Sequence, residues 1–303
     1  MPRLRRRLAR GIGSLAALSL LITVLLAVSG GNPASSESSS LGPATKLAPL
    51  PSISITFAAN STAEVNSLVN TDRSYIEPGD SFDLVSGTPS TSPLAVGEIN
   101  YWASLLRAAY PGAAIFASTS GIAHFATLAK KVNADISGIF YDYEPGYEAE
   151  FTVNFTQTLA EFTNVTEVAH AHGLLSIGYP TGRPISEPKF RSDHWDYGAL
   201  SGVVDRLDVQ TQTYCHESAR SFENATSRVR DQYAAVGASG IPTFQVTLGI
   251  NASLTPNQVS PSQAYNCTQV LTGDGLKTLY LWFGPGSNSD VLRFLKDIGR
   301  TPT

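Results

Sequence analysis

Eight short runs of β-branched and aromatic residues recur along this chain, and most are separated by segments with the apolar spacing of a helix. The runs cover residues 53–59, 82–86, 113–118, 138–144, 174–179, 207–214, 243–250 and 277–283. Segments 100–109, 122–132, 151–172, 219–236 and 290–298 place apolar residues three and four positions apart, as amphipathic helices do. Strands that alternate with helices indicate parallel βα units. The sequence therefore predicts an α/β fold, a single (β/α)8 TIM barrel spanning residues 53–303.

The first 52 residues have a different composition from the predicted barrel. Residues 1–29 hold five arginines followed by an uncharged apolar run, which is the pattern of a secretory signal peptide. Residues 11–29 nearly reach the length of about 20 residues that a spanning helix needs, so an uncleaved anchor that tethers the protein to a membrane is the alternative. Residues 30–52 are rich in Ser, Pro, Gly and Ala, which predicts a linker. We expect a secreted or cell-surface protein.

Export also changes the charge of the chain. Removing the five N-terminal arginines leaves 16 basic residues against 25 acidic residues, a formal net charge of −9. Such a surface repels phosphate backbones, and no basic stripe is present, so we expect no nucleic-acid partner. The charges are scattered and no exposed heptad pattern occurs, from which we expect a monomer.

Two further features fit an exported chain. Six Asn-x-Ser/Thr triplets could accept N-linked glycans, although a sequence rich in Ser and Thr also forms such triplets by chance. The six asparagines are Asn60, Asn154, Asn164, Asn224, Asn251 and Asn266. The chain has two cysteines, Cys215 and Cys267, which follow the sixth and seventh predicted strands, so we expect one disulfide between them. Reactive or metal-binding cysteines are the alternative.

Two carboxylates end the fourth predicted strand, where the active site of such a barrel lies. The run reads Ser-Gly-Ile-Phe-Tyr-Asp-Tyr-Glu-Pro-Gly from residue 137 to residue 146, and the strand period of two places Asp142 and Glu144 on one face. Two neighbouring negative charges raise the pKa of one of them. A general acid needs such a raised pKa, so Glu144 would stay protonated while Asp142 stabilises charge beside it. The alternative is an ordinary polar strand end with two solvated carboxylates, which has the same sequence pattern.

This run resembles the Asp-Gly-x-Asp-x-Asp-x-Glu signature of family 18 glycoside hydrolases, the chitinases and endo-β-N-acetylglucosaminidases. Gly138, Asp142 and Glu144 match the signature, whereas Ser137 and Phe140 replace its first two aspartates. The resemblance implies a (β/α)8 barrel in which Glu144 is the proton donor and Asp142 positions the acetamido group of the substrate. Phe140 removes an aspartate that the family uses in proton handling by the residue at position 142.

Other positions agree with the same resemblance. Gln212 and Tyr214 end the sixth predicted strand as the family's Met/Gln-x-Tyr does, which implies that the Tyr214 hydroxyl holds the acetamido group. Trp282, which shares a strand face with Tyr280, stands where the family has a tryptophan under the sugar ring. Ser118 begins Ser-Thr-Ser-Gly, an imperfect version of the family's Ser-x-Gly-Gly. Trp282 as a core aromatic and Tyr214 as a buried hydroxyl are the structural alternatives.

What is missing also bears on the mechanism. A retaining glycosidase with a protein nucleophile needs a second carboxylate from another strand end. The ends of the last two predicted strands offer none, and Asp208 lies too early in its strand to reach the mouth. This absence favours the substrate-assisted route, and the resemblance to family 18 implies a retaining glycosidase that cleaves N-acetylhexosamine-containing oligosaccharides or polysaccharides. No cofactor and no metal are expected, because the sequence has no phosphate-binding glycine loop and no metal-ligand spacing.

Two other classes of function stay open from the sequence. A barrel at the cell surface that binds carbohydrate without cleaving it is the first, since Phe140 departs from the family motif. A barrel with a structural role in a cell envelope is the second, and it predicts no sugar binding.

Overall fold

Eight parallel strands close into a barrel in the computed structural model of the protein. It describes residues 53–85, 95–143, 155–180, 196–212, 241–248, 258–273, 277–283 and 288–303, all within one unit spanning residues 46–303. The strands of the barrel are β1 (Ser54–Ala59), β2 (Ser81–Val85), β3 (Ala114–Thr119), β4 (Gly138–Tyr143), β5 (Leu175–Pro180), β6 (Arg206–Gln212), β7 (Ile241–Leu248) and β9 (Thr278–Phe283). Each pairs with its neighbour in sequence from β1 to β7, and β9 pairs with both β7 and β1, which closes the ring.

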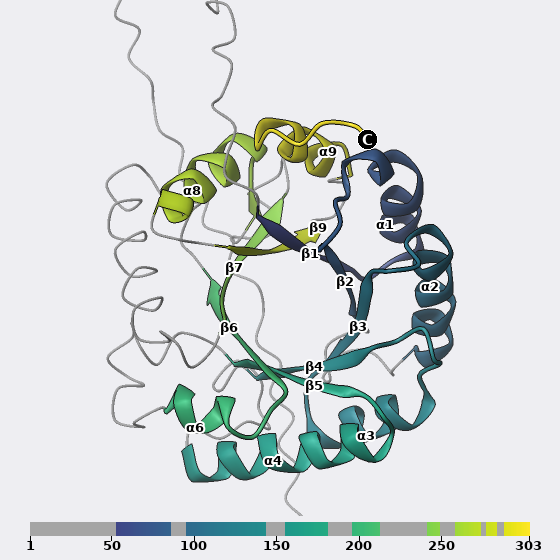
Figure 1. The fold of residues 1–303 in the computed structure, drawn as a ribbon, viewed down its shortest axis with the longest axis vertical. Helices are drawn as coiled ribbons and strands as arrows, with labels where there is room; N and C mark the ends of the chain where they lie inside the picture. Colours follow the sequence, from purple (N-terminus) through teal and green to yellow (C-terminus); the bar gives the residue numbers. More distant parts are fainter. Residues whose placement is uncertain are drawn as a thin grey trace, which may run out of the picture. The chain divides into compact units, whose positions relative to one another are not determined.

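Helices surround this ring (Figure 1). They are α1 (Thr62–Asn66), a π-helix at Ser67–Thr71, a 3-10 turn at Arg73–Tyr75, α2 (Val96–Ala109), α3 (Ile122–Lys131), α4 (Phe155–Ala171), α6 (Tyr197–Ser201), α8 (Pro261–Gly273) and α9 (Asn288–Asp297). The ring of strands and the outer layer of helices confirm the predicted single (β/α)8 barrel.

The predicted elements agree with the described ones in most places. Every predicted strand overlaps an observed strand, and no strand end differs by more than two residues. The structure adds a two-residue strand, β8 (Gln258–Val259), which pairs with the end of β7, and it adds the helices α1, α6 and α8, which the apolar spacing did not predict. The predicted helix at residues 219–236 lies outside the described residues, as do the N-terminal signal or anchor and the linker up to residue 52.

Alternate residues of the strands pack into two separate apolar clusters. One cluster lies between the sheet and the helices and includes Tyr141 and Tyr143 of β4, which contact the Phe162 ring of α4. The other, which we name the lumen cluster, lies inside the barrel. Its buried members are Ala58, Phe116, Phe140, Ile177, Tyr179 and Tyr280. The period of two in each strand thus separates a helix-facing core from a lumen.

A buried ion pair ties the C-terminus to the start of the barrel. The Arg300 guanidinium donates to both carboxylate oxygens of Asp80, which precedes β2, and to the backbone carbonyl oxygens of Tyr75 and Ile53. The Asp80 carboxylate also accepts from the backbone N–H of Ile55, at 2.8 Å. Both side chains are almost fully buried, so these bonds satisfy charges that would otherwise be costly inside the protein.

Candidate active site

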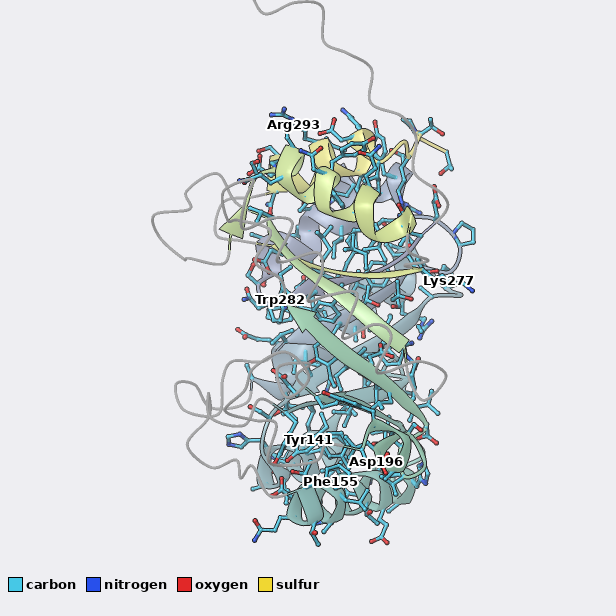
Figure 2. The ribbon with its side chains drawn as sticks, turned by 90° about the vertical axis from the view of Figure 1, so that its left-hand side faces the viewer. Tyr141, Phe155, Asp196, Lys277, Trp282 and Arg293 are labelled. Carbon is cyan, nitrogen blue, oxygen red and sulfur yellow. The ribbon has the colours of Figure 1, made fainter. Side chains whose placement is uncertain are left out.

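The carboxyl ends of the parallel strands share one rim, and those predicted site residues that the structure describes lie on strands that end there. Figure 2 shows Trp282 and Lys277 at opposite ends of β9, so Trp282 lies toward the carboxyl rim. Asp142 lies one residue before the end of β4, and its register partner on β5 is Tyr179. Ser118 of β3 is the register partner of Phe140. Phe140 precedes Asp142 by two residues on β4, so Ser118 lies deeper in the barrel than Asp142.

Asp142 lies at the upper edge of the lumen cluster. It is half-buried, and the preceding residue on the same strand face, Phe140, is fully buried. The Asp142 carboxylate is one of the charges that raise the pKa of the Tyr280 hydroxyl, which places the two side chains in the same electrostatic environment. The prediction that Asp142 faces the lumen is therefore consistent with the structure.

Ser118 and Tyr280 both donate hydrogen bonds to a residue that the sequence reasoning missed. This residue is Asp83 of β2, and its Oδ2 atom accepts from the Ser118 hydroxyl and from the Tyr280 hydroxyl. Asp83 is fully buried. Three strands, β2, β3 and β9, thus bring a carboxylate and two hydroxyl groups together inside the barrel.

Burial decides the ionisation of Asp83. Desolvation raises its pKa to about 6, although the hydrogen bonds from Ser118 and Tyr280 and the charge of Arg206 oppose the rise. The charge of Asp208 adds to it. Among the described residues, the Oδ1 atom of Asp83 has no hydrogen-bond partner. Asp83 is therefore a carboxyl group that titrates close to neutral pH, with one oxygen bound and the other unbound.

A second buried carboxylate, Asp208 of β6, forms an ion pair with Arg206 of the same strand. The Arg206 Nε atom donates to Asp208 at 2.7 Å, and a second guanidinium nitrogen donates to the other oxygen. The Arg206 guanidinium also lies 5.6 Å from the ring centroid of Phe116 and 5.7 Å from that of Phe140. Asp208 thus serves an internal ion pair, which agrees with the expectation that it does not act at the mouth.

Phe140 is the centre of an aromatic layer in the lumen. Its ring makes edge contacts with Phe116 at 5.2 Å, Tyr179 at 5.4 Å and Tyr280 at 6.1 Å between centroids. Tyr179 and Tyr280 stack on each other at 5.1 Å. The residue that replaces the motif's aspartate therefore fills the barrel with apolar surface below Asp142, a place where an unpaired carboxylate would be strongly desolvated.

Trp282 continues this layer toward the rim. Its ring lies 5.8 Å from that of Tyr280, and the side chain is half-buried against the lumen cluster. The indole Nε1 atom is buried and has no hydrogen-bond partner among the described residues. An aromatic face with an unbound donor is a suitable contact for a polar ring such as a sugar.

Several predicted residues cannot be placed in this site. Glu144, Tyr214 and Cys215 lie outside the described residues, as do the side chains of Gln212 and Cys267. The catalytic role of Glu144 and Tyr214, the sugar contact of Gln212 and the disulfide therefore stay predictions. No group of His, Cys, Asp and Glu residues in the described part of the chain could hold a metal ion.

The structure also bears on surface and membrane expectations. Asn60, Asn164 and Asn266 are exposed, whereas Asn154, Asn224 and Asn251 lie outside the described residues. Glycosylation of Asn60, Asn164 and Asn266 is sterically permitted by their exposure and stays a prediction. Within the described ranges, no helix has both the length and the apolar character required to cross a membrane.

The comparisons with known proteins bear on the fold. No protein-family model and no curated protein matches the sequence. The glycoside hydrolase domain of PgaB from Bordetella bronchiseptica matches the structure with a TM-score of 0.57 and 10% identity, over 84% of this chain and 100% of that domain. The chain has the fold of this glycoside hydrolase domain.

Two further structures support the same conclusion. A GH18 chitinase from Pseudoalteromonas aurantia matches with a TM-score of 0.52 and 13% identity, over 81% of this chain and 98% of the chitinase. The spore cortex-lytic enzyme SleL from Bacillus cereus matches with a TM-score of 0.55 and 8% identity, over 82% of this chain and 75% of SleL. At such low identities the similarity concerns the fold, and the function has to be argued from the site.

Proposed function

We propose that the protein is an exported glycoside hydrolase that cleaves N-acetylhexosamine-containing glycans. The observation that carries the proposal is the position of Asp142 and Trp282 on the lumen side of the barrel, toward the carboxyl rim where such barrels bind substrates. Asp142 supplies a carboxylate, and Trp282 supplies an aromatic face with an N–H group that has no hydrogen-bond partner in the part of the chain that the structure describes. The sequence places a second carboxylate, Glu144, two residues after Asp142.

In the proposed mechanism Glu144 acts first as general acid and then as general base. It protonates the glycosidic oxygen while the N-acetyl oxygen of the substrate attacks the anomeric carbon. The bond to the leaving sugar breaks, and the cyclic intermediate carries a positive charge that Asp142 stabilises. Glu144 then removes a proton from the water that opens this intermediate, so the product keeps the configuration of the substrate. Tyr214 and Gln212 are assigned to the acetamido group.

Trp282, Tyr280 and Ser118 were predicted as substrate contacts, and we keep only Trp282 in that role. The hydroxyl groups of Ser118 and Tyr280 donate to Asp83 below the rim, which commits them to this buried carboxylate. They contribute to the site by holding Asp83.

Turnover of an aryl chitobioside by the purified protein tests the proposal. Glu144→Gln should lower kcat/KM by about 10²- to 10⁴-fold, the contribution typical of a general acid. The matched control is Glu167→Gln on the exposed face of α4, which removes one carboxylate outside the barrel and should leave turnover unchanged. Equal loss in both variants, or none in Glu144→Gln, would contradict the assignment.

The substrate-assisted route has a test of its own. An aryl cellobioside carries a hydroxyl group where the chitobioside carries the N-acetyl group, so it lacks the internal nucleophile. The route predicts turnover of the chitobioside alone, with retained configuration at the product's anomeric carbon by NMR. Comparable turnover of both substrates would point to a protein nucleophile instead.

The alternative is a barrel that binds carbohydrate without cleaving it, and Phe140 is the observation that favours it. The ring occupies the lumen position below Asp142, where the motif has a carboxylate. In that case the wild-type protein binds chitooligosaccharides without turnover, and Glu144→Gln leaves the affinity unchanged.

A further inference from the structure

Two buried polar atoms on the lumen side of the barrel have no hydrogen-bond partner among the described residues. One is Oδ1 of Asp83, which in the ionised carboxylate can only accept, and the other is Nε1 of Trp282, which can only donate. Buried polar atoms normally find partners, because leaving a hydrogen bond unmade is costly. An acceptor and a donor left open in one lumen point to a ligand that supplies what both lack.

The two residues belong to one row of the sheet. Ala58 of β1 is the register partner of Asp83 on β2 and of Trp282 on β9, so β1 alone separates them. Neighbouring strands lie about 4.8 Å apart, which puts the Cα atoms of Asp83 and Trp282 about 9–10 Å from each other. Ala58 also faces the lumen, and its side chain is a single methyl group. No long side chain from β1 therefore stands between the carboxylate and the indole.

This row lies near the carboxyl ends of its three strands. Ala58 is one residue before the end of β1, Trp282 one residue before the end of β9, and Asp83 two residues before the end of β2. Barrels of this kind bind their substrates at the carboxyl rim. A sugar ring in contact with Trp282 would therefore carry its hydroxyl groups beside the two open atoms.

Tyr280 holds the Asp83 carboxylate in one orientation. Its hydroxyl group and that of Ser118 each donate their only proton to Oδ2, so Oδ1 is the oxygen left open. The Tyr280 ring also lies 5.8 Å from the Trp282 ring, so one side chain contacts both the carboxylate and the indole. Polar groups fixed in this way are preorganised for a ligand.

We propose that Asp83 and Trp282 form a subsite that binds one hydroxyl group of the sugar whose glycosidic bond is cleaved. The hydroxyl oxygen accepts from Nε1 of Trp282, and the hydroxyl proton is donated to Oδ1 of Asp83, so one group satisfies both atoms. The inference rests on the proposed function, because it concerns the sugar that Trp282 contacts there. It makes Asp83 a specificity-determining residue, which selects substrates that carry a hydroxyl group facing this row.

Deoxygenated substrates test this subsite. In an aryl chitobioside, the sugar that carries the aryl group has two free hydroxyl groups, at C3 and C6, because C1, C2 and C4 hold the aryl group, the acetamido group and the second sugar. An analogue that has hydrogen in place of the bound hydroxyl group leaves both protein atoms unpaired. For one of the two analogues, kcat/KM of the wild type should therefore fall by about 10- to 100-fold, which is the deoxygenation penalty.

Asp83→Asn reverses the hydrogen-bonding character of the open side. The hydroxyl groups of Ser118 and Tyr280 need an oxygen to donate to, so the amide oxygen replaces Oδ2 and the amide nitrogen faces the subsite. The hydroxyl group of the substrate then meets two donors and no acceptor. The deoxygenation penalty should therefore fall below about threefold. The matched control is Asp297→Asn on α9, which removes an equal charge in the outer helical layer and should keep the wild-type penalty.

Trp282→Phe tests the donor half of the subsite and covers the case in which Asp83→Asn does not fold. The variant keeps an aromatic face but loses the N–H group, so the deoxygenation penalty should shrink here too. A purely structural role of either residue would lower kcat/KM equally for the parent substrate and the analogue. A penalty as large as that of the wild type, measured in either folded variant, would therefore overturn the inference.

Binding measurements separate this inference from the proposed function. If the wild type shows no turnover, the glycosidase proposal fails, and titration calorimetry with the same three compounds decides the subsite from the ratios of their dissociation constants. If neither analogue differs from the parent compound in turnover or affinity, the subsite is refuted while a measured glycosidase activity stands. A protein that neither cleaves nor binds these compounds refutes both.

Discussion

Replacing Gly138 by alanine should destabilise the barrel, because β4 and β5 leave no room for a side chain there. A Cβ atom at this position would lie 2.6 Å from the backbone oxygen of Leu175, 2.8 Å from its Cβ atom and 2.9 Å from the Cδ1 atom of Ile177. The first two atoms are fixed by the β5 backbone, so a rotamer change cannot relieve the contact. The strands themselves would have to move apart.

The size of the effect follows from this geometry. Overpacking a closely packed core costs about 1–3 kcal/mol, and the fixed backbone contact places Gly138→Ala at the upper end of that range. At about 2–4 °C per kcal/mol for a domain of this size, the melting temperature should fall by roughly 6–12 °C. Differential scanning calorimetry of the variant and the wild type measures this directly.

Gly97→Ala is the matched control for this experiment. Gly97 is exposed near the start of α2, and nothing lies within 4 Å of the Cβ atom it would gain. Because alanine is a better helix former than glycine by up to about 1 kcal/mol, this variant should melt at or slightly above the wild-type temperature. If Gly138→Ala also melts there, the steric argument is wrong, and the glycine of the motif needs another explanation.

Two further predictions concern buried charges. Arg300→Ala leaves Asp80 buried without its partner and should lower the free energy of unfolding by about 3–5 kcal/mol. The control Arg293→Ala breaks an exposed pair with Asp297 and should lower it by about 0.2–0.5 kcal/mol. Similar losses for the two variants in urea unfolding would contradict the argument from burial. Burial raises the pKa of Asp83 from 3.8 to about 6, so its contribution to stability is greatest below pH 4 and is lost as the pH rises through 6. The difference in unfolding free energy between Asp83→Asn and the wild type should therefore shift in favour of the variant by up to about 3 kcal/mol from pH 4 to pH 7. A difference that does not change with pH would contradict this.

The fold could be predicted from the sequence because a parallel barrel has a strong local pattern. Its strands are buried on both faces, so each is a short apolar or aromatic run, and the helices between them carry an amphipathic period. The pattern was weakest where buried residues are small or polar. Helix α8, for example, buries Ala264, Tyr265 and Thr268, of which only Tyr265 is large and apolar.

The candidate site could be predicted only in part, for a different reason. Asp142 and Trp282 were found because each belongs to a motif that runs along one strand. Asp83 belongs to no such motif, and its partners Ser118 and Tyr280 are 35 and 197 residues away in sequence. One signal was present, since Ser81 and Asp83 alternate with Phe82 and Leu84, which predicts a polar lumen face on β2.

Phe140 and Asp83 are best understood as one arrangement. Phe140 packs against Tyr280, the residue that donates to Asp83, so a carboxylate at position 140 would enter the same apolar layer. Together with Asp83 and Asp142 it would place three acidic groups around one tyrosine hydroxyl, where like charges and desolvation both oppose ionisation. A barrel that carries the buried acid on β2 therefore favours an uncharged residue at this point of β4. Phe140 therefore fits the apolar layer around Tyr280, and the departure from the motif at position 140 does not by itself indicate a site that has lost its chemistry.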